Sequence, residues 1–190
     1  IQHGEVRILA RGRKIALIRG INVGRSKRIP MAELRTLVAD FGHADVRTVL
    51  NSGNVVFTAK DDTPAELATQ IEKALLMRLD VTARVVVLTE DEITTVMSEN
   101  TLADKADDPS KLIVAVPFAA ADCSKLEPLL DQDWDDDAMA LGKRAAYLWC
   151  AGGILESRLP NSVSRLLKDA VTTRNWTTMQ KIQELAAVKG

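Results

Sequence analysis

RGINVGRSKR, residues 19–28, joins the first strand-like run of the chain to its first helical pattern. Two glycines in this segment, Gly20 and Gly24, allow the backbone to turn and to expose its N–H groups. The segment also carries a cluster of cationic side chains, namely Arg19, Arg25, Lys27 and Arg28. Exposed N–H groups beside guanidinium and ammonium groups are suited to binding an anion. The sequence therefore predicts a binding site here, but it identifies no reaction.

The segments on both sides of this loop set the start of the fold. The apolar run at 15–18 precedes it and predicts a strand that is buried on both faces. Pro30 follows it and is well placed as the first residue of an amphipathic helix. Two runs rich in β-branched residues, 46–50 and 54–58, then flank the turn-forming sequence at 51–53, which predicts a hairpin.

The next segment completes a repeating pattern of strands and helices. Thr63 and Glu66 have the spacing of a capping box with Pro64 between them, which predicts the start of a helix. The consecutive valines that follow this helix predict another buried strand. Strand, helix, strand, strand, helix, strand is the arrangement called ferredoxin-like. Residues 14–88 are therefore expected to form a ferredoxin-like βαββαβ half.

Residues 89–190 predict a second half that also mixes helices and strands. A capping box at Thr89 and Glu92 opens a short helix. Beyond it the patterns predict a strand, a short helix, a strand and two closing helices, at 111–117, 122–130, 145–150, 161–170 and after Asn175. With the strand at 145–150 taken as part of a probable hairpin, the order strand, helix, hairpin, helix resembles the first half without its last strand. We therefore expect an α+β fold in which a related, incomplete second half packs against the open sheet face of the first as one compact unit.

The composition of the chain and its cysteine positions limit the class of protein to which it can belong. A chain with 46% hydrophobic residues can build a substantial core, and no apolar run approaches the ~18 residues of a membrane span. Residues 1–13 do not start with Met, and we expect them to be an extension outside the fold. Cys123 and Cys150 lack the spacing of a disulfide framework or a metal site. These features predict a cytoplasmic protein with no signal peptide, membrane partner or cofactor, and they do not set its oligomeric state.

The formal net charge of −1 hides a separation of charge along the chain. Residues 1–60 contain 11 Lys and Arg against 4 Asp and Glu, and residues 141–190 contain 8 against 3, whereas the middle is acidic. This balance argues against general nucleic-acid binding, although the two basic segments could meet as one patch. A mixed, solvated surface is the alternative interpretation.

Several catalytic and metal-binding motifs lack the residues they need. Segment 20–26 resembles a phosphate-binding loop, but it is too short and has no Lys before Ser26. The two histidines, His3 and His43, offer little for acid–base catalysis or metal ligation. The acidic run at 131–137 lacks the glycine and final glutamate of a calcium loop, so we expect a solvated loop and no metal. No catalytic residue is identified.

Three polar motifs are expected to meet at one rim of the molecule. In a ferredoxin-like half the first and third strands are antiparallel neighbours, so Arg19–Gly24 and Asn51–Asn54 should share an edge. Thr172–Trp176 adds hydroxyl groups and an arginine at the predicted start of the last helix, where anions are favoured. We predict that a small anionic or nucleotide-like ligand binds at this rim. The predicted ligand-binding residues are Arg19, Asn22, Gly24, Ser52, Asn54, Arg174, Asn175 and Trp176.

Two alternatives to this binding site stay open. In the first, Arg25, Lys27 and Arg28 extend a basic patch that binds nucleic acid. In the second, the motif residues are structural, because Asn and Gly suit tight turns, Asn175 is a good N-cap and Trp176 is a natural core residue. An internal hydrogen-bond network would then lock the two halves together without any ligand.

Taken together, the motifs resemble those of a known family. They are RGINVG at 19–24, Pro30-Met31 with Leu34, NSGNVVF at 51–57, and TRNW at 173–176 with Lys181. In this order they resemble the bacterial family catalogued as domain of unknown function 1697, over about residues 14–187. The resemblance implies a ferredoxin-like α+β architecture and no established activity. Arg25-Ser26 departs from the family pattern, in which a further glycine-rich step is expected, and makes the loop more basic.

Overall fold

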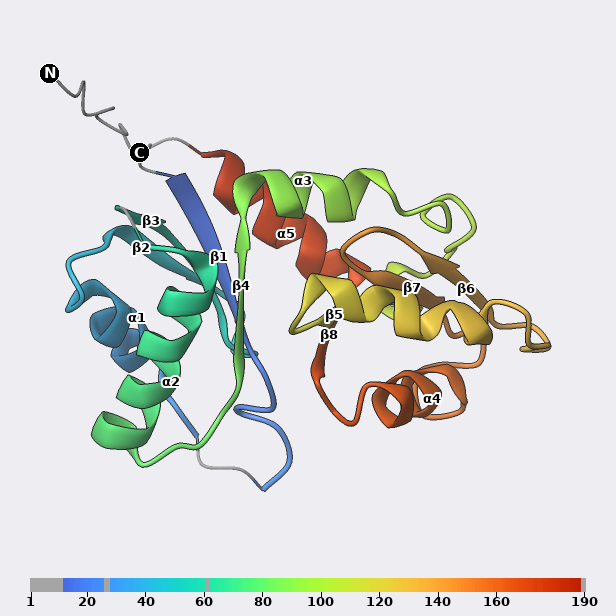
Figure 1. The fold of residues 1–190 in the computed structure, drawn as a ribbon, viewed down its shortest axis with the longest axis horizontal. Helices are drawn as coiled ribbons and strands as arrows, with labels where there is room; N and C mark the ends of the chain where they lie inside the picture. Colours follow the sequence, from blue (N-terminus) through green and yellow to red (C-terminus); the bar gives the residue numbers. More distant parts are fainter. Residues whose placement is uncertain (1–11, 26–27, 61, 189–190) are drawn as a thin grey trace, which may run out of the picture.

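Two four-stranded antiparallel sheets with helices packed on both of their faces make up this α+β protein (Figure 1). The structure is a computed structural model and describes residues 12–25, 28–60 and 62–188. Lys27, His3 and most of the predicted extension therefore lie outside the described residues. Within the described ranges, no helix is both long enough and apolar enough to cross a membrane.

The first sheet follows the predicted order of elements. These are β1 (Gly12–Ile18), α1 (Met31–Ala39), β2 (Ala44–Val49), β3 (Asn54–Ala59), α2 (Pro64–Leu79) and β4 (Val85–Thr89). The strands lie in the order β2-β3-β1-β4. The prediction that the first and third strands are antiparallel neighbours is confirmed, with Leu17 opposite Asn54. The ends of β1 and the start of β3 therefore share one edge of the sheet.

The second sheet repeats this connectivity and corrects one prediction. Its elements are β5 (Leu112–Pro117), the 3₁₀ helix η2 (Ala120–Leu129), β6 (Ala138–Leu141), β7 (Ala146–Trp149), α4 (Leu159–Leu166) and β8 (Val171–Asn175), and its strand order is β6-β7-β5-β8. The prediction of an incomplete second half was wrong, because the strand thought to be missing is β8. Residues 172–175, which were assigned to the start of the last helix, form this strand instead, since backbone pairing with β5 holds them extended.

A helix follows the last strand of each half and lies between the two sheets. α3 (Glu90–Ser98) follows β4 and α5 (Trp176–Ala187) follows β8; in Figure 1 α3 runs along the top of the molecule, and α5 passes below it towards the centre. Both capping boxes predicted from sequence are present, at Thr63 with Glu66 and at Thr89 with Glu92. The inner faces of both sheets share one apolar core with α3 and α5. The prediction that the second half covers the open face of the first is therefore confirmed.

Each sheet also has an outer core of its own. α1 and α2 cover the outer face of the first sheet, while α4 and η2 cover that of the second (Figure 1). The strands β1, β3, β5 and β7 are consequently apolar on both faces, as the continuous apolar runs predicted. A short 3₁₀ turn, η1 (Pro109–Lys111), leads into β5. The result is a layered arrangement in which loops at the strand ends meet between the halves.

Arg13 belongs to the fold, although the sequence analysis placed it in an extension. Its side chain is 9% exposed and its guanidinium pairs with the Asp45 carboxylate at 2.8 Å. Its other N–H groups donate to the C-terminal carbonyl oxygens of α5, at Leu185 (3.2 Å), Ala186 (3.4 Å) and Val188 (2.7 Å). The Leu185 carbonyl also accepts from the N–H of Val188, the C-cap residue, at 3.3 Å, and a cation is favoured at this end of the helix dipole. The structural boundary therefore moves from residue 14 to Gly12.

We expect Arg13→Ala to lower the free energy of unfolding by about 3 kcal/mol, because it removes a buried ion pair and the cap of α5. Urea-induced unfolding followed by circular dichroism measures this change. Arg47→Ala is the matched control, since Arg47 pairs with the same Asp45 at 2.8 Å from a side chain that is 40% exposed. The control should cost less than about 1 kcal/mol. Equal losses in the two variants would contradict a buried clamp at Arg13.

Candidate functional site

A pocket of about 280 Å³ opens between the two halves, where the loop after β1 meets β8. The turn before β3 and the helix α4 close its other sides. We call it the Arg174 pocket. Its lining residues are Arg19, Gly20, Ile21, Val23, Ser52, Ser164, Val171, Thr172, Thr173 and Arg174. Of the predicted ligand-binding residues, Arg19, Ser52 and Arg174 therefore line one pocket.

Arg174 reaches from the second sheet into the first half. Arg174 is 9% exposed, and each N–H group of its guanidinium donates a hydrogen bond. Nε donates to the Asn54 side chain (2.6 Å), and Nη2 donates to the carbonyl oxygens of Ile18 (2.8 Å) and Ser52 (3.1 Å). Nη1 donates to the Thr172 hydroxyl (2.9 Å) and the Thr173 carbonyl (2.8 Å). One guanidinium thus joins the end of β1, the turn before β3 and β8.

The charge of Arg174 has no counter-ion in this network. Every acceptor is an amide, a hydroxyl or a carbonyl oxygen, and no carboxylate among the described residues bonds to the guanidinium. Burial lowers the pKa of Arg174 to about 10, so the group stays cationic at neutral pH. A buried cation with neutral partners leaves a positive potential in its surroundings, which here include an open pocket.

The turn before β3 positions two of these acceptors. Asn54 is fully buried, and its amide nitrogen donates to the Val49 carbonyl (2.9 Å) and the Ser52 hydroxyl (2.8 Å) while its oxygen accepts from Arg174. Gly53 has a φ of +82°, and a Cβ there would lie 2.9 Å from the Ile21 side chain. Only glycine therefore lets the turn lie against the loop after β1.

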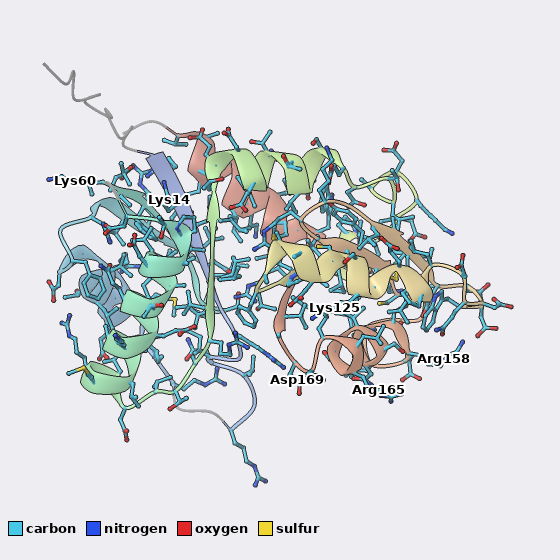
Figure 2. The ribbon with its side chains drawn as sticks, in the orientation of Figure 1. Lys14, Lys60, Lys125, Arg158, Arg165 and Asp169 are labelled. Carbon is cyan, nitrogen blue, oxygen red and sulfur yellow. The ribbon has the colours of Figure 1, made fainter. Side chains whose placement is uncertain are left out.

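Arg19 stands at the mouth of the pocket. It donates to the backbone carbonyl of Asp169 and, at 3.4 Å, to the Asp169 carboxylate, whose side chain is 72% exposed. Asp169 lies on the connection between α4 and β8 (Figure 2). Because this ion pair is solvent-exposed and long, it is weak. An anionic ligand could therefore compete with Asp169 for the guanidinium of Arg19.

The open edge of β8 adds a backbone donor to the pocket. β8 is an edge strand, and the Phe118 N–H donates to the Ala170 carbonyl at 3.1 Å. Backbone groups alternate along an antiparallel ladder, so those of Thr172 and Arg174 face β5 and those of Thr173 face away from it. The Thr173 carbonyl accepts from Arg174, but in the described part of the chain the Thr173 N–H has no acceptor. Because Thr173 is exposed, this N–H can donate to water or to a molecule in the pocket.

Asn22 organises the loop after β1. Its backbone is left-handed, with a φ of +57°, and its amide nitrogen donates to the carbonyl oxygens of Ile29 and Asn51, both at 2.9 Å. Its side-chain oxygen accepts from the Ile29 N–H at 2.7 Å, and Arg28 donates to its backbone carbonyl. Asn22 therefore ties the loop to the turn before β3. Its amide N–H groups are both occupied by these contacts.

Three other predicted ligand-binding residues have different surroundings. The Asn175 side chain accepts from the Thr178 N–H at 2.9 Å and caps α5, and Trp176 is 8% exposed within the core between the sheets. Gly24 is exposed and is not among the pocket-lining residues. Sequence reasoning missed Ser164 and Asp169, because nothing in the pattern of α4 marks a residue as facing another half. It missed the Thr173 N–H because β8 was not recognised.

A family described as "Protein of unknown function (DUF1697)" matches residues 12–147. The chain belongs to this family. The match begins at β1 and ends within β7, so it includes the loop after β1 and the turn before β3. A search of curated proteins returned no match.

A solved structure shows the same overall fold as this family member. It is that of the conserved bacterial protein SP0830 from Streptococcus pneumoniae, with a TM-score of 0.70 and 22% sequence identity. The similarity covers 93% of this chain and 99% of the other. At this identity the comparison establishes the arrangement of helices and strands and carries no residue roles.

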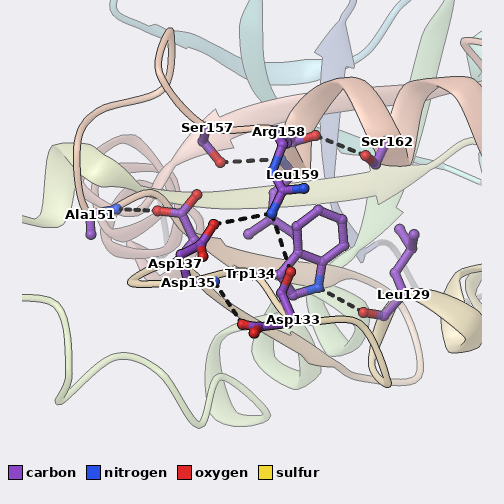
Figure 3. Close-up of polar contacts among 10 residues, drawn as sticks. All are labelled: Leu129, Asp133, Trp134, Asp135, Asp137, Ala151, Ser157, Arg158, Leu159 and Ser162. Carbon is purple, nitrogen blue, oxygen red and sulfur yellow. Dashed lines mark hydrogen bonds and ion pairs between the residues drawn. The ribbon is translucent and has the colours of Figure 1, made fainter.

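The carboxylates of the acidic loop after η2 bond to the protein itself. In the acidic loop after η2, Asp133 accepts from the Asp135 N–H (3.0 Å) and Asp137 accepts from the Ala151 N–H (2.8 Å). Asp135 pairs with Arg158 at 3.2 Å (Figure 3). The carboxylates therefore shape the loop, and the described residues contain no group of three or more His, Cys, Asp or Glu placed to hold a metal.

The two thiols are not activated. Cys123 and Cys150 are both buried and free. Burial is the main cause that raises the pKa of each thiol above its ordinary value. A thiol with a raised pKa is protonated and weakly nucleophilic at neutral pH. The structure therefore gives no support to cysteine chemistry.

We expect Arg174→Gln to lower the free energy of unfolding by about 2–5 kcal/mol, because it leaves buried acceptors in both halves without a donor. A double-mutant cycle with Asn54→Ala, measured by urea unfolding, should give a coupling energy of about 1 kcal/mol or more. Arg174→Lys separates charge from geometry, since Lys keeps the cation but cannot span the same acceptors. If Arg174→Lys were as stable as the wild type, the planar arrangement of donors in the guanidinium would not be needed for stability.

Proposed function

We propose that the chain binds a small anionic or nucleotide-like ligand in the Arg174 pocket. The observation that carries this proposal is the buried guanidinium of Arg174, which has only neutral acceptors and lines an open pocket. Because no described residue supplies a carboxylate to this guanidinium, an anion in the pocket would gain Coulombic energy that a neutral molecule would not.

The residues of the pocket have separate tasks in this proposal. Arg174 contributes charge but no direct hydrogen bond, because its N–H groups are already taken. Direct contacts come from Arg19, whose pairing with Asp169 is weak and exposed, and from the Thr173 N–H. The Ser52 hydroxyl accepts from Asn54 and keeps its own proton free to donate. This set of donors suits the oxygens of a phosphate or a carboxylate.

Nucleic-acid binding is the alternative that the basic loop suggests. Arg25 is exposed, but Arg28 donates to the backbone of its own loop and Arg19 faces Asp169. Two of the described cations of this segment, Arg19 and Arg28, therefore already bond to acceptors within the chain. A salt titration distinguishes the two ideas, because phosphate-backbone contacts make affinity fall steeply with salt.

Isothermal titration with inorganic phosphate, AMP and ribose 5-phosphate tests the proposed function. We expect saturable binding to the wild type, and at least tenfold weaker binding to Arg19→Gln, which corresponds to about 1.4 kcal/mol. Arg158→Gln is the matched control. Arg158 also donates to an exposed aspartate and to a backbone carbonyl, at 3.2 Å each, but it lies at the acidic loop (Figure 3).

The control variant should bind each anion as the wild type does. Equal losses in Arg19→Gln and Arg158→Gln would point to a general effect of charge and would overturn the proposed site. No binding of any of the three anions would leave the Arg174 network with the structural role alone. Tight binding of short RNA or DNA with a steep salt dependence would favour the nucleic-acid alternative instead.

A further inference from the structure

A second pocket of about 220 Å³ occupies the corresponding place on the other side of the interface between the halves. The Arg174 pocket is lined by the loop after β1, the turn before β3, the edge strand β8 and α4. The second is lined by the loop after β5, the turn before β7, the edge strand β4 and α2. We call it the Arg144 pocket. Its lining residues are Pro64, Ala65, Ala68, Val85, Val86, Val87, Glu92, Phe118, Ala120 and Arg144.

Arg144 is buried in this pocket and keeps unused donors. The residue is 6% exposed. Its Nε lies 3.3 Å from a Glu92 carboxylate oxygen, and its Nη1 donates to the Pro117 carbonyl at 2.7 Å. Neither N–H of its Nη2 has an acceptor within residues 12–25, 28–60 and 62–188. Nη2 is not one of the buried side-chain atoms that lack a partner, so it is accessible from the pocket, and a ligand oxygen there can take a charge-assisted hydrogen bond from it.

The open edge of β4 supplies further hydrogen-bonding groups to this pocket. The Arg19 N–H donates to the Arg84 carbonyl at 2.9 Å, so the alternation of the ladder turns the backbone groups of Val85 and Val87 away from β1. The Val85 N–H is taken by Glu72 at 2.8 Å. In the described part of the chain the Val87 N–H has no acceptor, and Val87 lines the pocket.

The remaining walls are apolar and carry a modest positive charge. Pro64, Ala65 and Ala68 present small side chains from α2, and Phe118 presents an aromatic ring. The Arg84 guanidinium stacks over that ring, 4.2 Å from its centre. Glu92 compensates Arg144, so Arg84 remains as the excess cation at this side of the pocket. A monoanion with an apolar body fits this balance better than a dianion, which the nearby Glu92 carboxylate would repel.

We propose that the Arg144 pocket binds a small monocarboxylate with an apolar body. The carboxylate accepts from Nη2 of Arg144 and from the Val87 N–H, while the apolar body lies against Phe118 and the small side chains of α2. This site is independent of the Arg174 pocket, because none of its lining residues is shared with that pocket. Two ligands of different charge could therefore occupy the interface between the halves together.

NMR titration with benzoate tests this site, with benzamide as the uncharged counterpart of the same shape. We expect saturable shifts of the Val87 amide and of the Arg144 Nε–H with benzoate, and at least tenfold weaker binding of benzamide. Arg144→Lys should weaken benzoate binding at least tenfold, because Lys lacks the paired donors of the guanidinium. Ala68→Leu fills part of the pocket from α2 and should weaken binding without touching any polar contact.

Two control variants locate the ligand. Ala32→Leu enlarges an exposed alanine near the start of another helix, α1, and should leave benzoate binding unchanged. Arg19→Gln alters the Arg174 pocket alone and should also leave it unchanged. Benzoate binding that survives Ala68→Leu, or that is lost in Arg19→Gln, would overturn the proposal, as would the absence of saturable shifts at Val87. Should Arg144→Lys fail to fold, Ala68→Leu against Ala32→Leu still decides.

Discussion

The guanidinium of Arg174 is the contact on which the relation between the two halves depends. It starts from β8 in the second sheet and ends on the carbonyl oxygens of Ile18 and Ser52 and on the Asn54 side chain in the first half. The two carbonyl oxygens lie at the end of β1 and in the turn before β3, where the regular pairing of the sheet ends. A single planar group with five donors satisfies them together, which an apolar side chain could not do. The apolar core between the sheets supplies most of the stabilisation, whereas Arg174 fixes how the sheet ends align.

The duplicated topology explains why two pockets exist. In each half the order of strands leaves the fourth strand at an edge, and the loop after the first strand of the other half lies beside that edge. The two halves differ in what they place there. Leu88 of β4 lies opposite Ile15 and packs in the central core, whereas the matching position of β8, opposite Val114, is Arg174. One substitution of an apolar position by a cation thus distinguishes the two sides of the interface.

Local signals predicted the helices and most strands. The capping boxes at Thr63 and Thr89 and the apolar runs of β1 and β4 depend on residues that are near in sequence, and all of them are present in the structure. β8 was missed because its residues are polar and directly precede a helix cap at Asn175. Only the backbone pairing with β5, far away in sequence, makes them a strand.

The candidate site was predicted in part for the same reason. Arg19, Ser52 and Arg174 meet in one pocket, as the convergence of motifs predicted, but Trp176 and Asn175 serve the core and the helix cap. The structural roles of Arg13 and Arg144 were not predicted, because both side chains contact residues that are far away in sequence. Arg13 reaches carbonyl oxygens at Leu185 and Val188, and Arg144 lies between Glu92 and Pro117.

The two buried arginines of the interface differ in their free hydrogen-bond donors and in how far their charge is compensated. Arg174 has all of its donors occupied and no carboxylate partner, so under the proposal it would act on a ligand through its charge, over a distance and without strict geometry. Arg144 has a carboxylate partner and, among the described residues, unoccupied donors, so under the proposal it would act through directed hydrogen bonds while its charge is largely compensated. In the two proposals, the first arrangement favours any anion of suitable size, whereas the second favours a carboxylate that accepts from the free donors and carries an apolar body that fits the walls. The two halves share one topology, but their buried arginines lie at different places, Arg174 on β8 and Arg144 in the turn before β7. In the two proposals, this difference gives a single chain two kinds of recognition.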